Sequence, residues 1–260
     1  MPALAAPPSP PAPPATMDDA VAAYHGYVAE RLVELRGHAL TLRANIGNGA
    51  IGAAMQSWLD AQQTWQRVGA AYGSFGDLGD AIAPGSRGLE GGAESPDFTG
   101  LRRIEYGLWR GQGAGELIPV VDKLLEDIAA LEAKLPETAV EPSDMPLRLH
   151  EILEDSQRDH LSGRGDQGSG LALALARADV EATQEVLDVL RGLLDNLKSG
   201  FPARLDAELA AVSAAIDATQ RNEAWTDYAK VPRAERQTIN AALGRALESL
   251  SLVPALFSTD

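Results

Sequence analysis

The segment 98–111, FTGLRRIEYGLWRG, places an arginine, a glutamate and two aromatic side chains at helical spacing. Arg102 and Glu105 are three residues apart, so on an α-helix their side chains can touch. Glu105 would lie at the edge of the buried arc, where loss of water raises a carboxyl pKa and a neighbouring guanidinium lowers it. The pattern therefore fits an ion pair that fastens a helix, or one wall of a ligand site. In the second case Arg102, Tyr106 and Trp109 would line the cleft and contact the ligand.

The segment HEILED, at 150–155, carries a second group of side chains suited to a cation. His150 and Glu154 are four residues apart on one helix face, a spacing at which an imidazole and a carboxylate can share a metal ion. Glu151 points away from the apolar stripe of the same helix, so it faces solvent unless another part of the chain packs there. The alternative is an ordinary acidic, exposed helix face. His160 lies near the apolar arc and is expected to be a partly buried histidine whose hydrogen bonds are satisfied.

No catalytic signature accompanies these residues. The chain lacks H-E-x-x-H, G-x-S-x-G, a Walker sequence and a G-x-G-x-x-G that follows a strand. It also has no cysteine, which excludes disulfides, thiolate metal ligands and cysteine nucleophiles. The sequence therefore predicts a protein that is not an enzyme.

The net charge of −15 and the isoelectric point of about 4.7 set the electric field around the molecule. Such a field repels nucleic acid and anionic membrane surfaces and attracts cations, so we expect no nucleic-acid partner. No run of about 18 apolar residues occurs, and a transmembrane segment is therefore not expected. The first 16 residues hold seven prolines but no basic or continuous apolar region. They are expected to form a flexible leader and not a signal peptide.

Most of the remaining chain shows the periodicity of amphipathic helices, with apolar residues at three- and four-residue steps. The pattern predicts about eight helices and no strand, which is an all-α fold. The long helical segments cover 21–46, 51–72, 117–135, 146–161, 171–197, 205–216 and 239–250. Residues 73–99 are dense in Gly and Pro and are expected to form a long loop. Thr99 can then cap a short helix that holds the arginine and glutamate described first.

The segment PETAVEPSDMP interrupts the helical pattern near the middle of the chain. A division into four helices on each side predicts two four-helix-bundle lobes packed side by side. We therefore predict a leader at 1–16, an N-terminal helical lobe at 17–135, a linker at 136–146 and a C-terminal helical lobe at 147–260.

Three separate segments, in this order, carry a resemblance to a known family. SWLDAQQTWQRVGAAYGSFGDLGDAI resembles a helix that leads into a long loop, and FTGLRRIEYGLWRG resembles the signature helix whose hallmark is G-x-H-x-x-E. MPLRLHEILED, followed by LSGRGDQGSG, resembles a motif of the second half. Over roughly 21–253 the chain thus resembles the imelysin-like family, and within it the EfeO-like branch, the extracytoplasmic component of a bacterial ferrous-iron uptake system.

This resemblance implies two helical lobes with a cleft between them and an extracytoplasmic place in the periplasm or cell envelope of a bacterium. The Pro-rich leader would then be a tether that follows a signal peptide absent from this chain. The implied metal is iron, as Fe²⁺ or Fe³⁺, with Cu²⁺ and Zn²⁺ left open. The implied partners are a membrane iron permease and a peroxidase-type protein.

The resemblance also implies ligands, residue by residue. Glu105 matches the last position of the signature, Glu151 matches a carboxylate of the second-half motif, and Asp77 matches the aspartate of the family's F-G-D-L. Together with His150 these are the predicted metal ligands. Oxygen-rich sites of this kind suit hard cations and iron.

The sequence departs from the family pattern at the histidine of the signature, where Arg102 stands. A guanidinium stays charged and cannot coordinate a cation as neutral imidazole does. Three further positions that are acidic in the EfeO-like branch are Gln66, Gly69 and Ala83 in this chain. Three hypotheses remain: a metal-binding uptake component, a scaffold or interaction protein whose metal site is degraded, and a protein that binds an anionic metal chelate through Arg102. A metallohydrolase would need a bound metal with an open coordination position, and no residue here indicates one.

Overall fold

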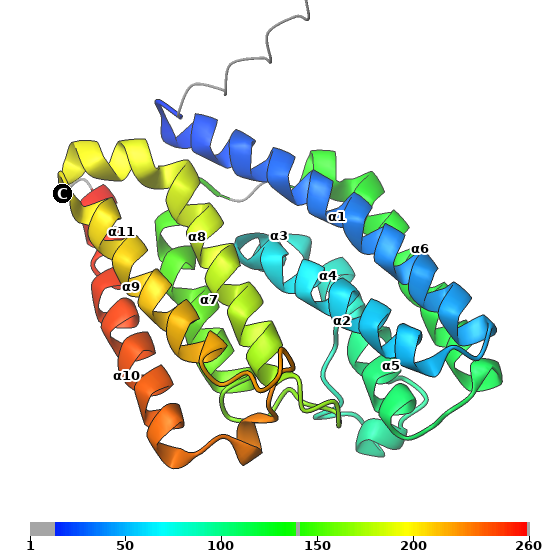
Figure 1. The fold of residues 1–260 in the computed structure, drawn as a ribbon. Coiled ribbons are helices and arrows are strands. Elements are labelled where there is room, and N and C mark those ends of the chain that lie inside the picture. The colour runs from blue at the N-terminus through cyan, green and yellow to red at the C-terminus, as the bar shows by residue number, and fades with distance from the viewer. Residues whose placement is uncertain (1–13, 139–140, 259–260) are drawn as a thin grey trace, which may run out of the picture.

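The computed structural model of the chain describes residues 14–138 and 141–258, and in these ranges it contains helices and no β-strand (Figure 1). The predicted all-α fold is confirmed. Residues 1–13 of the predicted leader and residues 139–140 of the predicted linker lie outside the described residues. The long helices are α1 (Met17–Gly47), α2 (Ile51–Val68), α5 (Gly100–Trp109), α6 (Ala114–Lys134), α7 (Met145–Asp159), α8 (Ala172–Leu197), α9 (Phe201–Asp217) and α10 (Arg233–Leu250). The short helical segments are η1 (Gly69–Ala71), α3 (Tyr72–Phe75), α4 (Asp77–Ile82), η2 (Gly92–Glu94), η3 (Leu135–Glu137), η4 (Tyr228–Lys230) and α11 (Val253–Phe257).

In helix α1, the local sequence determines where the helix begins and which face is buried. The Thr16 side chain accepts a hydrogen bond from the backbone N–H of Asp19, and the Asp19 side chain accepts one from the N–H of Thr16, each at 3.1 Å. This capping box satisfies two backbone donors that the first helical turn leaves free. Tyr24, Leu32 and Ile46, from the predicted apolar stripe, are all buried. The apolar stripe therefore forms the face of α1 that packs on α2 and α6.

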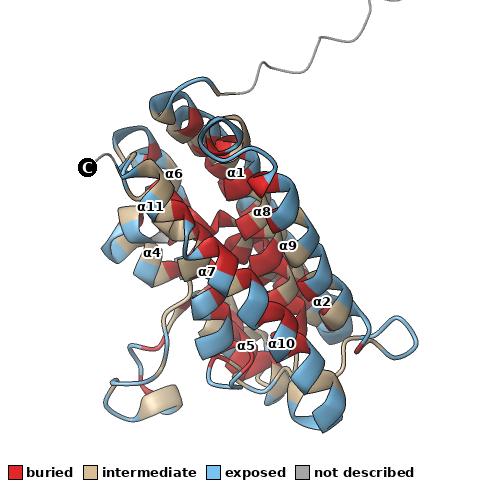
Figure 2. Cartoon of the chain, turned by 90° about the vertical axis from the view of Figure 1, so that its left-hand side faces the viewer, coloured by how far each residue is buried: buried red, intermediate tan, exposed pale blue. Residues whose placement is uncertain are grey.

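The helices associate in two neighbouring groups (Figure 1). α1, α2, α5 and α6 pack on one another, as do α7, α8, α9 and α10, and α2 also packs on α8. Gly69 in η1 shows how close the two groups come, since a Cβ there would lie 2.9 Å from Ala182 Cβ and 3.0 Å from Ile152 Cδ1. Buried apolar residues form a continuous cluster through both groups, and Figure 2 shows them on the inward faces of α1, α7 and α8. The division into two lobes stays a prediction.

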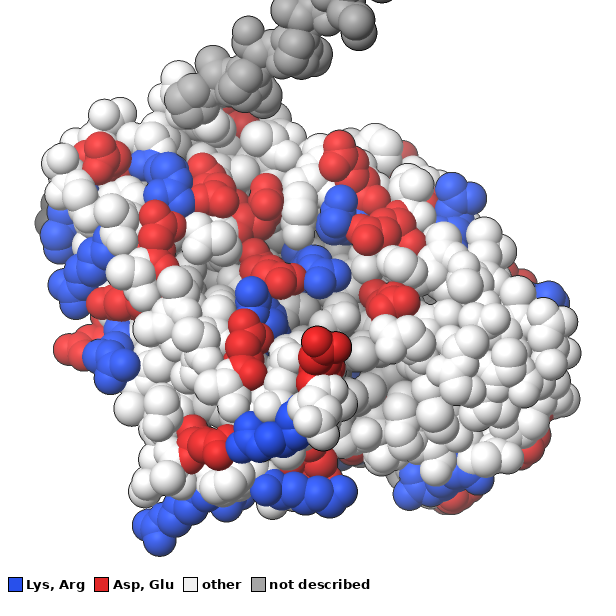
Figure 3. Space-filling model, in the orientation of Figure 1, with Lys and Arg blue, Asp and Glu red and all other residues white. Residues whose placement is uncertain are grey.

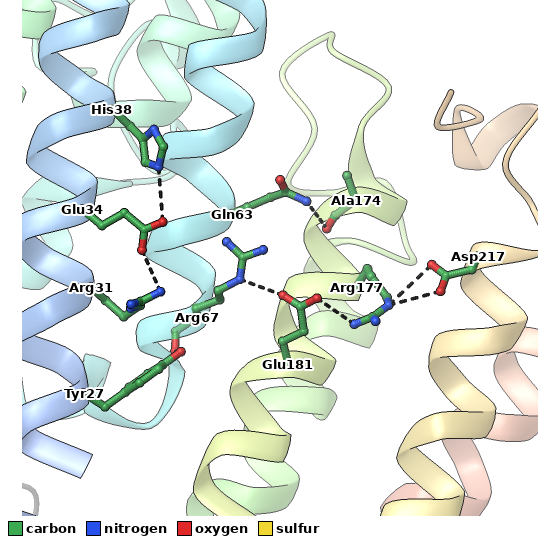
Figure 4. A network of polar contacts seen from close by, with 10 residues as sticks. All are labelled: Tyr27, Arg31, Glu34, His38, Gln63, Arg67, Ala174, Arg177, Glu181 and Asp217. Carbon is green, nitrogen blue, oxygen red and sulfur yellow. Dashed lines mark hydrogen bonds and ion pairs between the residues drawn. The ribbon is translucent and has the colours of Figure 1, made fainter. Parts of the chain in front are cut away.

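A chain of ion pairs joins α2, α8 and α9 at the surface (Figure 4). Arg67 Nε lies 2.7 Å from Glu181 Oε2, and the other oxygen of Glu181 accepts from Arg177 Nη1 at 3.0 Å. Arg177 Nε in turn lies 3.5 Å from Asp217. Because these side chains are partly exposed, each pair stabilises the fold by only about 0–1 kcal/mol. The network fixes the relative position of α2 and α8 more than it adds stability.

Residues 73–99 differ from the expected loop, because part of the segment is helical. α3 and α4 occupy its beginning and η2 lies near its end. Phe75 and Ile82 are buried, and this packing stabilises helices that are too short to form alone. Thr99 is the N-cap residue of α5, as predicted, but its side chain makes no capping hydrogen bond.

The charged residues are mixed over the visible face. Figure 3 shows Lys and Arg next to Asp and Glu over its left and centre, whereas the right-hand part carries few charged residues. Among the described residues, no helix is both long and apolar enough to cross a membrane.

Candidate functional site

A cavity of about 410 Å³ lies between α2, α4, α5, α7 and α8, and we call it the Arg102 cavity. The loop after α4 and the residue that follows α7 complete its wall. Its size falls within the range of small-molecule sites. The lining residues that matter most below are Gln62, Gln66, Arg102, Glu151, His160 and Asp179.

The family positions singled out in the sequence converge on this cavity. Gln66, Gly69, Ala83, Arg102 and Glu151 come from three separate segments, and all five line the Arg102 cavity. By the resemblance given above, three of them correspond to acidic side chains of the EfeO-like pattern, and one corresponds to the signature histidine. Of the five positions, only Glu151 offers a carboxylate in this chain.

Helix α7 turns a row of carboxylates towards the cavity. Glu151, Asp155 and Asp159 follow one another at four-residue steps, so they share one helix face. Each has an arginine partner: Glu151 is paired with Arg148, and Arg158 lies 2.7 Å from Asp155 and 3.1 Å from Asp159. The solvent-facing position expected for Glu151 is therefore only half correct, because α2 and α5 approach this face of α7 across the cavity.

The floor of the cavity is a buried polar cluster. His160 and Asp179 are 5% and 4% exposed, and His160 Nε2 lies 3.4 Å from Asp179 Oδ2 and 2.9 Å from Gln66 Nε2. Burial lowers the pKa of His160 to about 4, and the charge of Arg102 adds to the shift. Burial also raises the pKa of Asp179 well above its usual range. Both shifts disfavour the charged form of the side chain.

Arg102 is half-buried and lines the cavity. Among the described residues it has no hydrogen bond and no ion pair within 4.0 Å, so the ion pair with Glu105 that the spacing allows is not formed. Its charge still acts on the groups around it, because it contributes to lowering the pKa of Asp159 and of His160. The cavity thus contains a guanidinium that has no direct partner among the described residues.

Glu105 faces away from the Arg102 cavity, towards the Gly-rich loop between α7 and α8. Its carboxylate is 2% exposed and accepts hydrogen bonds from the backbone N–H groups of Gln167, at 2.9 Å, and Ser169, at 3.2 Å. Burial raises the pKa of Glu105 to about 7, and these hydrogen bonds only partly oppose the shift. In this structure Glu105 anchors a loop, and its role as a metal ligand stays a prediction.

The other two predicted ligands also lie outside the cavity. His150 donates from Nδ1 to the carbonyl oxygen of Leu147 at 3.0 Å, and its Nε2 lies 3.8 Å from Glu154 Oε2. Asp77 is exposed at the start of α4. Within the described residues no group of three or more His, Asp and Glu side chains is placed to hold a metal ion. The predicted set of Glu105, Glu151, His150 and Asp77 is therefore not brought together.

Tyr106 and Trp109, the two aromatic residues predicted to contact a ligand, lie outside the Arg102 cavity. Trp109 packs edge-on against Trp58, with ring centroids 5.1 Å apart. Tyr106 donates a hydrogen bond to Glu94, and the guanidinium of Arg110 lies 3.8 Å from its ring centroid. Tyr106 lines a hollow of about 700 Å³ on the other side of the Gly-rich loop, so neither aromatic residue reaches the Arg102 cavity.

Sequence reasoning missed Asp155, Asp159 and Asp179, and it expected His160 to be a partly buried, hydrogen-bonded histidine without placing it in a site. The four-residue steps from Glu151 gave a usable signal for the first two. Asp179 interrupts the apolar stripe of α8, and a carboxylate in a buried arc is itself a signal of a polar site. None of this could identify the partner helix, because the residues that meet across the cavity are far apart in the sequence.

Comparison with known proteins gives three findings. The imelysin family model, which carries a peptidase label, matches residues 20–253. The chain is 24% identical to "Iron uptake system component EfeO" of Escherichia coli over 94% of its own length and 65% of that protein. It is also 24% identical to "Iron uptake system component EfeM" of Pseudomonas syringae, over 89% of this chain and 81% of that one. The chain thus spans just under two thirds of the EfeO proteins that it matches.

A solved structure supports the same assignment at the level of the fold. An imelysin-like protein from Psychrobacter arcticum superposes with a TM-score of 0.62 and 17% identity, over 91% of both chains. The family model covers nearly all of the described helices. The chain therefore belongs to the imelysin family.

Proposed function

We propose that this chain is an extracytoplasmic component of bacterial iron uptake that binds its iron cargo in the Arg102 cavity and catalyses no reaction. The observation that carries the proposal is the convergence of Gln66, Gly69, Ala83, Arg102 and Glu151 on one cavity. The names of the relatives from Escherichia coli and Pseudomonas syringae, both iron uptake components, support the iron assignment. A membrane iron permease and a peroxidase-type protein are the partners that we propose from the family resemblance.

The chemistry of the cavity fits a cargo site better than an active site. Carboxylates of Glu151, Asp155 and Asp80 lie around it, and oxygen donors suit iron. The net charge of −15 concentrates cations near the molecule. His160 Nε2 lies 2.9 Å from Gln66 Nε2. We therefore place Glu151 first among the four predicted ligands.

Anaerobic calorimetric titration of the metal-free protein with Fe²⁺, and a parallel titration with Fe³⁺, tests this proposal. We expect saturable binding at about one iron per chain, weakened at least about tenfold in Glu151→Gln, because a carboxylate ligand is lost. Glu154→Gln, on the same helix but outside the cavity, is the comparison variant. Loss of binding in Glu154→Gln alone would move the site to His150 and Glu154. Equal binding by wild type and Glu151→Gln would contradict the proposed place of the cargo.

The second candidate is an imelysin-fold scaffold that has lost its metal site. Arg102 in place of the signature histidine favours it, as does the lack of a metal-binding group among the described residues. This candidate predicts that the wild-type protein binds no iron in any form, and the same titrations decide it.

A further inference from the structure

Binding of an iron cation alone does not explain why the cationic side chain of Arg102 lines the cavity. Its guanidinium is half-buried, lines the cavity and has no ion pair or hydrogen bond with a described residue. A partly desolvated cation without a partner is unfavourable, and a carboxylate can satisfy it with two parallel hydrogen bonds. Arg148, the other arginine of the cavity, is already paired with Glu151. An anionic ligand group therefore has one evident place to bind.

The carboxylates around the cavity do not exclude such an anion. Asp155 and Asp159 are paired with Arg158, which lies outside the lining, and Glu151 is paired with Arg148. Of the remaining carboxylates, the buried Asp179 lies 3.4 Å from His160 Nε2 and forms no ion pair with Arg102 in the described structure. Asp80 is exposed. The charge of Arg102 thus stays available to a ligand.

Two buried oxygen atoms of residues that line the same cavity indicate what else the ligand carries. Gln62 is 2% exposed and Asp179 is 4% exposed, and both line the cavity. Gln62 Oε1 accepts no hydrogen bond in the described structure, and Asp179 Oδ2 has no hydrogen bond there beyond its 3.4 Å approach to His160 Nε2. Buried polar atoms of this kind normally have a partner. A ligand with hydroxyl as well as carboxylate groups would supply the missing donors.

We propose that the Arg102 cavity takes iron as an anionic hydroxycarboxylate chelate, with a free carboxylate of the chelate bound by Arg102. A hydroxyl of the chelate donates to Gln62 Oε1 on the cavity floor, and Glu151 approaches the metal with its carboxylate. The cavity, at about 410 Å³, has room for a ligand of this size. This inference rests on the proposed function and names the form in which the cargo arrives.

The test measures binding of three probes: ferric citrate, citrate alone, and Fe²⁺ in anaerobic buffer without citrate. Quenching of Trp65, which lines the cavity, reports occupancy, and calorimetry confirms it.

Arg102→Gln is expected to weaken ferric citrate binding at least about tenfold, because a charge-assisted pair is lost. Arg103→Gln is the matched control. Arg103 lies on the same helix as Arg102, donates a hydrogen bond to Gln112 at 2.7 Å and does not line the cavity. The control should change the affinity by less than about twofold.

Unfolding curves of each variant show whether the fold survives. If Arg102→Gln does not fold, Arg102→Lys replaces it, because lysine keeps the charge but loses the two-pronged geometry; it should still bind ferric citrate more weakly than the wild type does. Ferric citrate binding that is equal in wild type and Arg102 variants overturns the inference. So does citrate binding as tightly as ferric citrate, because the iron would then play no part. Glu151-dependent Fe²⁺ binding together with indifference to ferric citrate overturns the chelate and leaves the proposed function standing. Failure of every iron probe overturns both.

Discussion

At the scale of single residues, burial decides what the acidic and basic groups of this chain can do. Glu105 matches a ligand position of the family signature, yet it is buried against the loop that contains Gln167 and Ser169. Arg102, three residues earlier, turns into the cavity instead of towards Glu105. Two side chains that spacing permits to pair are thus directed to different sides of α5.

The pKa of Glu105 leads to a prediction about stability and pH. Its folded-state pKa is raised by burial to about 7 from an ordinary value of 4.5, so between these pH values the folded state holds a proton that the unfolded state has released. Stability of the wild type should therefore fall as pH rises through this window, by on the order of 3 kcal/mol, and then level off. Glu105→Gln cannot ionise, and its amide oxygen can still accept both hydrogen bonds, so it should lack this loss.

Urea unfolding of both proteins between about pH 4.5 and pH 8 measures the difference in free energy. Glu126→Gln, an exposed position on α6, is the control and should follow the wild type. Parallel curves for wild type and Glu105→Gln would show that Glu105 titrates normally. A difference that disappears when Fe²⁺ is added would instead support Glu105 as a metal ligand.

At the scale of elements, the start of α5 depends on one glycine. Gly100 has φ +69°, and a Cβ there would lie 2.4 Å from the carbonyl oxygen of Ile82 and 2.7 Å from Pro84 Cδ. The first glycine of the signature therefore allows the N-terminus of α5 to pack directly on the end of α4. This contact carries Arg102 and Ala83 to the same cavity.

Gly100→Ala is expected to destabilise the protein by about 3 kcal/mol, because the left-handed backbone and the close backbone contact both oppose a side chain. Gly244→Ala is the matched control: Gly244 lies inside α10, and a Cβ there meets nothing within 4 Å. Alanine is the better helix former, so this variant should be as stable as the wild type or more stable by up to about 1 kcal/mol. Urea denaturation of both variants and of the wild type measures the change in the free energy of unfolding. Equal stability of Gly100→Ala and wild type would show that α4 and α5 separate freely.

At the scale of the whole molecule, one continuous core connects helices from both halves of the chain. Gly69 packs on Ile152 and Ala182, and Arg67 pairs with Glu181 across the same boundary. Unfolding of one half alone would expose this shared core to water, so we expect the halves to unfold together, even if they correspond to two lobes.

Unfolding in urea is accordingly expected to be a single transition. Trp225→Phe leaves its tryptophans only in α2 and α5, so its fluorescence reports the first half and circular dichroism reports all helices. The two signals should give the same midpoint. A fluorescence midpoint that differs from the dichroism midpoint would show that the halves unfold independently, as separate lobes would.

The local sequence was sufficient for what depends on local periodicity. The apolar stripes predicted α1, α2, α6, α8, α9 and α10, since a helix must bury the face on which its apolar residues recur. The Gly- and Pro-rich segment 73–99 concealed α3 and α4, because these short helices are stabilised by burial of Phe75 and Ile82 and not by their own propensity. The family positions Gln66, Gly69, Ala83, Arg102 and Glu151 were also found from the sequence, through resemblance.

Only the tertiary structure decided which of these side chains meet. Asp179 and His160 come together with Gln66 because α8 packs on both α2 and α7, and no spacing within one helix encodes that contact. The same packing removes water from both side chains and so disfavours their charged forms. The direction of Arg102, into a cavity and away from Glu105, likewise depends on how α5 is held against its neighbours. Sequence thus determines the helices and the side chains they present, whereas long-range packing determines their partners and their charge.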